Sequence, residues 1–203
     1  MRLPPAWLVV LSGVVIAMHV GKMPPAIPVL QQALGVTLVQ AGFLLSAVQL
    51  AGMCLGVLAG MSDDRLGVLA GMSADRLGLR RSLLTGQAIL ATASLCGMVV
   101  TSPSGLLLLR ALEGLGFLLA ALPAPSLIRQ LVRPSQLPLY LGLWSTYMGT
   151  GIALALLAGP LAMQALGWQG WWGLLGLLSV RLPARKNPPV PARCTGGFFK
   201  PNR

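Results

Sequence analysis

Long apolar runs without charge constrain the fold of this chain more than any other feature. A helix needs about 20 apolar residues to cross the hydrocarbon core of a bilayer. Segments of that length cover residues 7–30, 38–60, 82–101, 106–128 and 137–163. A shorter run at 168–180 is too short to span comfortably. Because lipid satisfies no backbone polar groups, the runs predict helices. We therefore expect an all-α integral membrane helical bundle over residues 1–180.

Composition agrees with the bilayer and argues against a soluble protein. Apolar residues make up 55% of the chain and charged residues only 9%, whereas soluble domains carry about 25% charged residues. The net charge of +11 is strongly basic, but the cations lie between apolar runs or in the tail, without aromatic residues beside them on one face. This pattern indicates basic loops at a lipid bilayer, and we expect no nucleic-acid partner.

Catalytic and metal chemistry is not predicted. The chain has one histidine and three widely spaced cysteines without a CxxC pair, so neither a metal site nor a disulfide framework is indicated. The few carboxylates form no pair outside the loop between the second and third runs. We therefore expect no enzyme activity and no cofactor.

The cations alternate between the two ends of the predicted helices. The uncharged connections are residues 35–37, 102–105 and 164–170. The other connections hold Arg65, Arg76, Arg80 and Arg81 after the second run, and Arg129 and Arg133 after the fourth. By the positive-inside rule, this asymmetry places the N-terminus and the basic loops in the cytoplasm. The expected location is a plasma membrane, such as the bacterial inner membrane.

Three motifs point to one family. GMSADRLGLRR (residues 71–81) fits the pattern G-x-x-x-D-[RK]-x-G-x-[RK]-[RK] and resembles the signature loop of the major facilitator superfamily. LLLLRALEGLGFLLAA (106–121) resembles the helix-four pattern of that family, with Glu113 where glutamine is usual. LGWQGWWGLL (166–175) resembles its turn between helices five and six, with Gln169 where arginine is expected.

The resemblance implies the N-terminal six-helix half of a secondary active transporter, here with a shortened sixth helix. It also implies that the signature loop is a conformational latch, because in the family this loop biases which side of the transporter is open. A plain basic loop that only sets topology is the alternative. The latch residues would be Gly71, Asp75, Arg76, Gly78, Arg80 and Arg81.

An eleven-residue stretch is doubled before the latch. LGVLAGMSDDR (55–65) is followed directly by LGVLAGMSADR (66–76), and only the second copy carries the complete motif. In one arrangement, the second helix ends near Gly60 and the extra apolar residues lie along the inner interface. In the other, the helix slides and buries Asp63, Asp64 and Arg65, at a cost of a few kcal/mol each. We expect the first arrangement.

Two cations fall inside predicted spans at matching depth. Lys22 and Arg110 both lie ~22 Å from the inner end of their helices, since an α-helix rises 1.5 Å per residue. One turn further in lie His19 and Glu113, and the i, i+3 spacing puts Glu113 on the face of Arg110. Lys22 and Arg110 are therefore predicted to hold a small anion, with Glu113 and His19 carrying a coupling proton.

Weaker candidates and an alternative accompany this site. Gln49 and Tyr147 are further substrate-lining candidates. Alternatively, Arg110 and Glu113 only neutralise each other, and Lys22 extends to the outer headgroups.

The chain changes character after the sixth run. Residues 181–203 form a basic, proline-rich tail that is predicted to be disordered and to bind anionic lipid, although a shifted or truncated reading frame explains the change equally well. The predicted function is secondary transport of a small solute, expected to be an anion and proton-coupled. The alternatives are an inactive truncated remnant of a transporter gene and a chain that forms an oligomer to supply a missing second half.

Overall fold

The computed structural model describes residues 4–61 and 78–181, and of residues 51–61 it describes only the backbone. The described residues form helices joined by short connections, which confirms the all-α prediction. The helices are α1 (Pro5–Gly21), α2 (Met23–Leu34), α3 (Leu38–Met61), α5 (Leu79–Gly97), α6 (Pro103–Ala121), α7 (Ala124–Leu131), the 3₁₀ turn η1 (Pro134–Gln136), α8 (Leu137–Ser145) and α9 (Tyr147–Arg181).

Proline and glycine divide several of the predicted spans. The first span breaks at Lys22, between α1 and α2. Pro24 and Pro25 cause this break, because they cannot donate the N–H groups that would continue the hydrogen-bond ladder. Within α9 the backbone turns at Gly167, with φ 70° and ψ 174°. Glycine fits there because it adopts positive φ without steric cost.

Three helical stretches among the described residues, each including a break or turn, are long and apolar enough to cross a membrane. They are Pro5–Leu34, Pro103–Leu131 and Pro134–Arg181, and a shorter apolar helix covers Leu38–Leu50. The prediction of five spans and a partial sixth remains a prediction.

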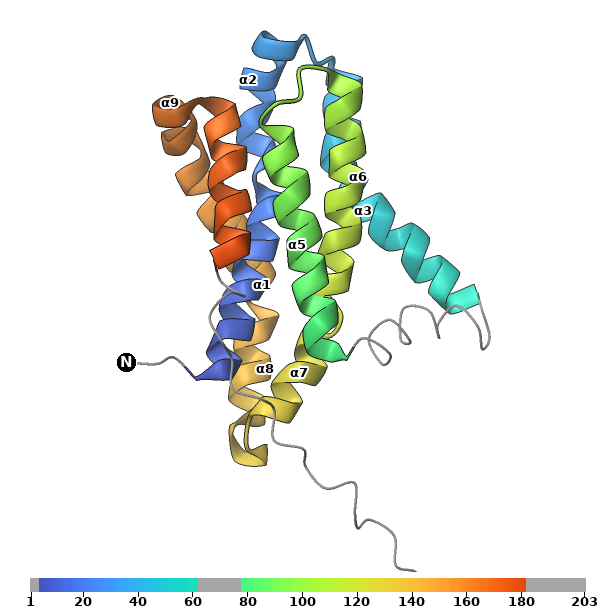
Figure 1. Ribbon diagram of the computed structural model, residues 1–203, viewed down its shortest axis with the longest axis vertical. Helices are drawn as coiled ribbons and strands as arrows, with labels where there is room; N and C mark the ends of the chain where they lie inside the picture. The colour runs from blue at the N-terminus through green and yellow to red at the C-terminus, as the bar shows by residue number, and fades with distance from the viewer. Residues whose placement is uncertain (1–3, 62–77, 182–203) are drawn as a thin grey trace, which may run out of the picture.

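The helices run mostly along the long axis of the molecule (Figure 1). One end, called the lower end here, holds the start of α1, the start of α5, and α7 and α8. The opposite, upper end holds α2 and the connection between α5 and α6. After Gly167, α9 turns back and descends beside α5. The lower half of α3 leans away from the bundle.

Close approach between helices depends on glycine at two interfaces. A Cβ added to Gly86 of α5 would lie 2.5 Å from the backbone nitrogen of Ala120 in α6. A Cβ added to Gly151 of α9 would lie 2.5 Å from the Cβ of Ala17 in α1. No larger side chain fits at either position without moving a helix. The first contact brings α5 and α6 together, and the second brings α1 and α9 together.

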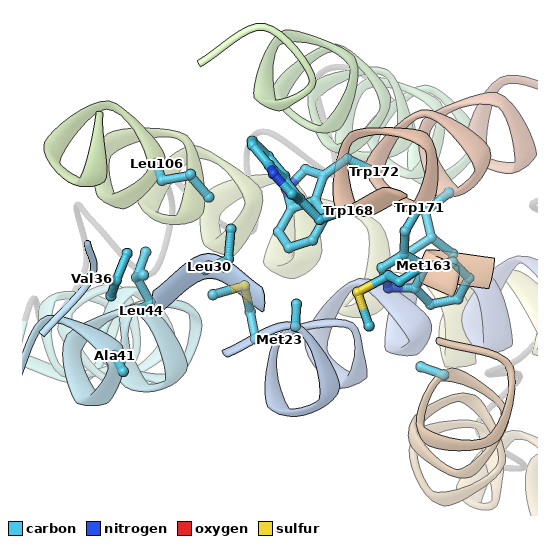
Figure 2. Close-up of a cluster of buried hydrophobic side chains, with 13 residues drawn as sticks. Met23, Leu30, Val36, Ala41, Leu44, Leu106, Met163, Trp168, Trp171 and Trp172 are labelled. Carbon is cyan, nitrogen blue, oxygen red and sulfur yellow. The ribbon is translucent and has the colours of Figure 1, made fainter. Parts of the chain in front are cut away.

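Apolar clusters fill the upper and lower parts of the bundle. Figure 2 shows the upper cluster, in which tryptophans of α9 face Met23 and Leu30 of α2. Its largest side chains are Trp168, Trp171, Trp172, Met23, Met163, Leu30, Leu44, Leu106 and Leu175. The lower cluster contains Val9, Val10, Leu83, Leu127, Ile128, Tyr140 and Trp144. Between the two lies the candidate site.

Several predictions concern residues outside the described ranges. The charged part of the doubled stretch and the first part of the latch, with Gly71, Asp75 and Arg76, lie between residues 62 and 77. The tail from residue 182 onward also lies outside the described residues.

Candidate functional site

Four of the predicted site residues meet in the interior of the bundle. Lys22 lies at the break between α1 and α2, and His19 lies one turn earlier on α1. Arg110 and Glu113 lie one turn apart on α6. The close approach of these helices brings the four side chains, called the ion cluster here, to one place.

The Glu113 carboxylate is the centre of the ion cluster. Lys22 Nζ donates to Glu113 Oε1. Arg110 Nη1 donates to Glu113 Oε2 at 2.5 Å. Two cations therefore hold one carboxylate, each on a separate oxygen. With the histidine neutral, the cluster carries a net charge of +1.

Backbone and hydroxyl groups are further partners of the two cations, although Arg110 Nη2 has no hydrogen-bond partner among the described residues. Lys22 Nζ also donates to Ser94 Oγ at 2.9 Å, and the ammonium lies 4.7 Å from the ring centroid of Trp172. Arg110 donates from Nη1 to the His19 carbonyl at 2.8 Å and from Nε to the Leu44 carbonyl at 3.3 Å. These contacts join α1, α3, α5, α6 and α9 through the two cations.

The imidazole of His19 extends the cluster toward the lower end. Its Nε2 lies 2.8 Å from Ser179 Oγ in the last turn of α9. Its Nδ1 lies 3.8 Å from Glu113 Oε1 and has no hydrogen-bond partner among the described residues. The ring therefore links the carboxylate on one side with a hydroxyl on the other.

The ion cluster is closed in this conformation. Lys22 is 0% exposed, and His19, Arg110 and Glu113 are each 1% exposed. Lys22 points into the bundle and does not extend to the outer headgroups, because Glu113 and Ser94 hold its ammonium inside. Isolated charges in such a place would cost several kcal/mol each, and mutual pairing offsets this cost. A solute can reach the cluster only if helices move apart.

Two other predicted residues do not join the cluster. Gln49 is exposed on α3. Tyr147, at the start of α9, stacks on Trp144 with 4.3 Å between ring centroids and packs against the lower cluster. Both therefore lie apart from the four residues that meet.

The described part of the predicted latch lies at the lower end, at the start of α5. Gly78 precedes the helix with φ 78°, where glycine is favoured. Arg80 is partly buried and Arg81 is exposed. Both arginines line a surface hollow together with Leu127 and Gln130 of α7. This hollow is separate from the ion cluster.

Three partners of the cluster, namely Ser94, Trp172 and Ser179, were not predicted from the sequence. Serine and tryptophan are common in apolar helices, so neither residue type marks a site. A weak signal existed on α5, where Gln87 and Ser94 are polar residues seven positions apart and therefore on one helix face. Within the described ranges, no three His, Cys, Asp or Glu side chains gather to hold a metal ion.

The outer surface of the bundle fits lipid. Large apolar side chains are exposed along α3, α6 and α9, including Leu38 (79%), Leu108 (65%) and Leu157 (73%). Apolar residues outside and a paired ion cluster inside are typical of a helical membrane protein with a polar site at its centre.

The comparison with known families agrees with this architecture. Residues 9–184 match the Major Facilitator Superfamily, and the chain belongs to that family. It is therefore an integral membrane protein of a class that carries out secondary transport of solutes, and proteins of this class are not enzymes. A search of curated proteins found no match to this chain.

Proposed function

We propose that this chain carries a small anion across the membrane together with a proton, and that the ion cluster is the site of coupling. The observation that supports this proposal is that Glu113 forms ion pairs with two cations. Lys22 and Arg110 already bind one carboxylate, so the site is built to bind an anion. A carboxylate or a small oxyanion of the solute has the same chemistry as the Glu113 side chain.

Protonation of Glu113 would couple the two ions. A neutral Glu113 no longer compensates Lys22 and Arg110, and the cluster then has a surplus of two positive charges. A solute anion that enters would restore compensation. Proton and anion binding therefore favour each other, which is the condition for symport.

Access to the cluster requires a second conformation. The four side chains are at most 1% exposed, so the present conformation is occluded. Secondary transporters open a central site alternately to each side by moving helix groups around it. In the same proposal, the loop that ends at Gly78, Arg80 and Arg81 acts as the latch between these states. The partial burial of Arg80 against the neighbouring helix supports this role.

The proposed location is the bacterial inner membrane, with the N-terminus and the lower end in the cytoplasm. The exposed arginines of the lower end, Arg81, Arg129 and Arg133, support this orientation. We also propose that a second copy packs against the exposed apolar faces of α3 and α6. This part rests on the two-half architecture of the family, and the mass of the chain in detergent would test it. A monomer that transports would overturn it.

Reconstitution tests the transport proposal. The purified chain is placed in liposomes that contain a pH-sensitive dye, and inorganic phosphate, sulfate, lactate or citrate is added outside. We expect internal acidification with at least one of these anions, and no such signal with Glu113→Gln. The exposed Arg129→Gln variant is the matched control and should behave like the wild type.

A non-transporting chain is the second candidate, and the closure of the ion cluster favours it. A buried cluster whose carboxylate already pairs with two cations also serves as a purely structural contact between α1 and α6. This candidate predicts no anion-dependent acidification and no isotope uptake with any of the four anions. That result would overturn the transport proposal.

A further inference from the structure

The surroundings of the ion cluster differ sharply between its two sides. Toward the upper end it is covered by the apolar cluster, with Met23, Leu106 and Trp168 among its buried members. Toward the lower end, polar side chains continue on α1, α5 and α9 before the lower cluster, with Val10 and Leu83, begins. His19 and Ser179 are each 1% exposed, and Gln87 is 0% exposed.

Gln87 lies on the helix face of α5 that meets α9. On this face, Ser94 donates to the Trp172 carbonyl at 2.9 Å. Further down, the Ala91 carbonyl lies 3.2 Å from a Cβ built on Gly176. The two helices are antiparallel, so residue numbers rise on one as they fall on the other. Continuing this register by one turn places Gln87 opposite Ser179.

The amide of Gln87 has no hydrogen-bond partner among the described residues. Neither its Oε1 nor its Nε2 is paired, although both atoms are buried. A buried amide without partners is costly and rare in proteins, and ordered water is a common explanation. In the ion cluster, His19 Nδ1 and Arg110 Nη2 are likewise buried without a hydrogen-bond partner among the described residues.

We infer that His19, Ser179 and Gln87 form an internal proton path between Glu113 and the lower end of the bundle, with water bound at the Gln87 amide. This inference rests on the proposed proton coupling at Glu113. Ser12, 4% exposed and seven positions before His19 on the same face of α1, continues the polar stripe toward the lower end. Ile16 and Leu90 fill the same level toward α6, so the path follows the α9 side.

Each proton moves along the path without a change in net charge at His19. An incoming proton passes from water at Gln87 to Ser179 Oγ, while the Ser179 hydroxyl proton passes to His19 Nε2. The Nδ1 proton then passes to the Glu113 carboxylate. The ring is left in its other tautomer, and the reverse transfer restores it. The 3.8 Å gap between Nδ1 and Oε1 exceeds a hydrogen bond, so a small approach of the ring or one bridging water completes this link.

The charged groups that face His19 favour a neutral relay. The Nδ1 side of the ring faces Glu113, which pairs with both Lys22 and Arg110, and an imidazolium would add a third cation to this cluster. On the other side the ring meets the Ser179 hydroxyl. A ring that changes tautomer moves a proton without that added charge.

Infrared spectroscopy after a rapid pH step tests the inference on the full chain in detergent. The carboxylic-acid stretch that appears in wild type and is missing in Glu113→Gln reports proton arrival at Glu113. Ser179→Ala and Gln87→Leu should slow its appearance about tenfold. This is the change in rate expected when a barrier rises by about the free energy of one hydrogen bond. The extent of protonation at equilibrium should stay unchanged. Thr92→Ala, an exposed α5 hydroxyl bonded within its own helix, is the matched control.

The outcomes separate this inference from the proposed function. If no Glu113 band appears at any pH at which the chain stays folded, proton coupling fails and the path fails with it. If the band appears but both variants protonate at the wild-type rate, the path is overturned and proton coupling stands. If a variant loses its helical circular dichroism signal, Ser179→Thr and Gln87→Glu replace it. They keep a polar group on the path and should restore a rate near that of wild type, and a slow rate in both would overturn the path.

Discussion

The interior of the bundle and its lower end use the same charged residue type in opposite ways. Arg110 is 1% exposed and donates to a carboxylate and to two carbonyls of other helices. Arg129 and Arg133 are exposed on the lower end, at and after the last turn of α7. The difference follows from solvent: a cation in water needs no protein partner, whereas the charge of a cation inside a bundle is compensated by a carboxylate and by carbonyl groups. Charge inside the bundle joins helices, and we propose that charge at the lower end orients the chain in the bilayer.

Removal of the central carboxylate should cause the largest loss of stability among the variants considered. Glu113→Gln leaves Lys22 and Arg110 buried without their shared anion. Breaking a buried pair in this way costs about 3–5 kcal/mol. Unfolding in mixed micelles, followed by circular dichroism, measures the loss. A change below about 1 kcal/mol would contradict the central role of the carboxylate.

Removal of one cation should cost less than removal of the carboxylate. Lys22→Met leaves Glu113 and Arg110 as a balanced pair in direct contact, and methionine fills the space of the lysine stem. We expect a loss of about 1–3 kcal/mol, below that of Glu113→Gln in the same assay. If Lys22→Met lowered the stability more than Glu113→Gln, uncompensated positive charge would not be the main cost of disrupting the cluster.

The hydroxyl that supports Lys22 should contribute less again. Ser94→Ala removes the hydrogen bond to Lys22 and the one to the Trp172 carbonyl. The remaining contacts of Lys22 hold the ammonium, so we expect a loss of about 1 kcal/mol. Thr92→Ala on the exposed face of the same helix should change the unfolding free energy by less than about 0.5 kcal/mol. Equal losses of unfolding free energy in the two variants would contradict a stabilising role of Ser94 in the cluster.

The smallest effect on stability is expected for the arginines of the lower end. Their proposed role is to orient the chain in the membrane. Arg129→Gln and Arg133→Gln should each change stability by less than about 0.5 kcal/mol, because both side chains are exposed. In a background without the native cysteines, a cysteine placed at Ser135 should react with a membrane-impermeant reagent from the cytoplasmic side. A cysteine at Ser104 should react from the opposite side. Labelling on the reversed sides would refute the proposed orientation.

Much of this architecture could be predicted from the sequence. Uncharged runs of about 20 residues require helices in lipid, because no other open structure satisfies the backbone. The meeting of Lys22, Arg110, Glu113 and His19 was also predictable in outline, since their depths match on neighbouring spans. The breaks at Lys22 and Gly167 follow from local chemistry, namely prolines that lack N–H groups and a glycine at positive φ.

Only the tertiary structure decided what the cations bind. From sequence, Lys22 and Arg110 were predicted to hold a solute anion, with pairing of Arg110 and Glu113 as the alternative. In the folded bundle both cations donate to Glu113. Helical periodicity fixes depth and face, but it does not fix the rotation of one helix against another. That rotation is set by close contacts such as those at Gly86 and Gly151, and these contacts also bring Ser94, Trp172 and Ser179 to the cluster. The sequence determined at which depth in the apolar spans the charged residues lie, and helix packing determined which partner neutralises each of them.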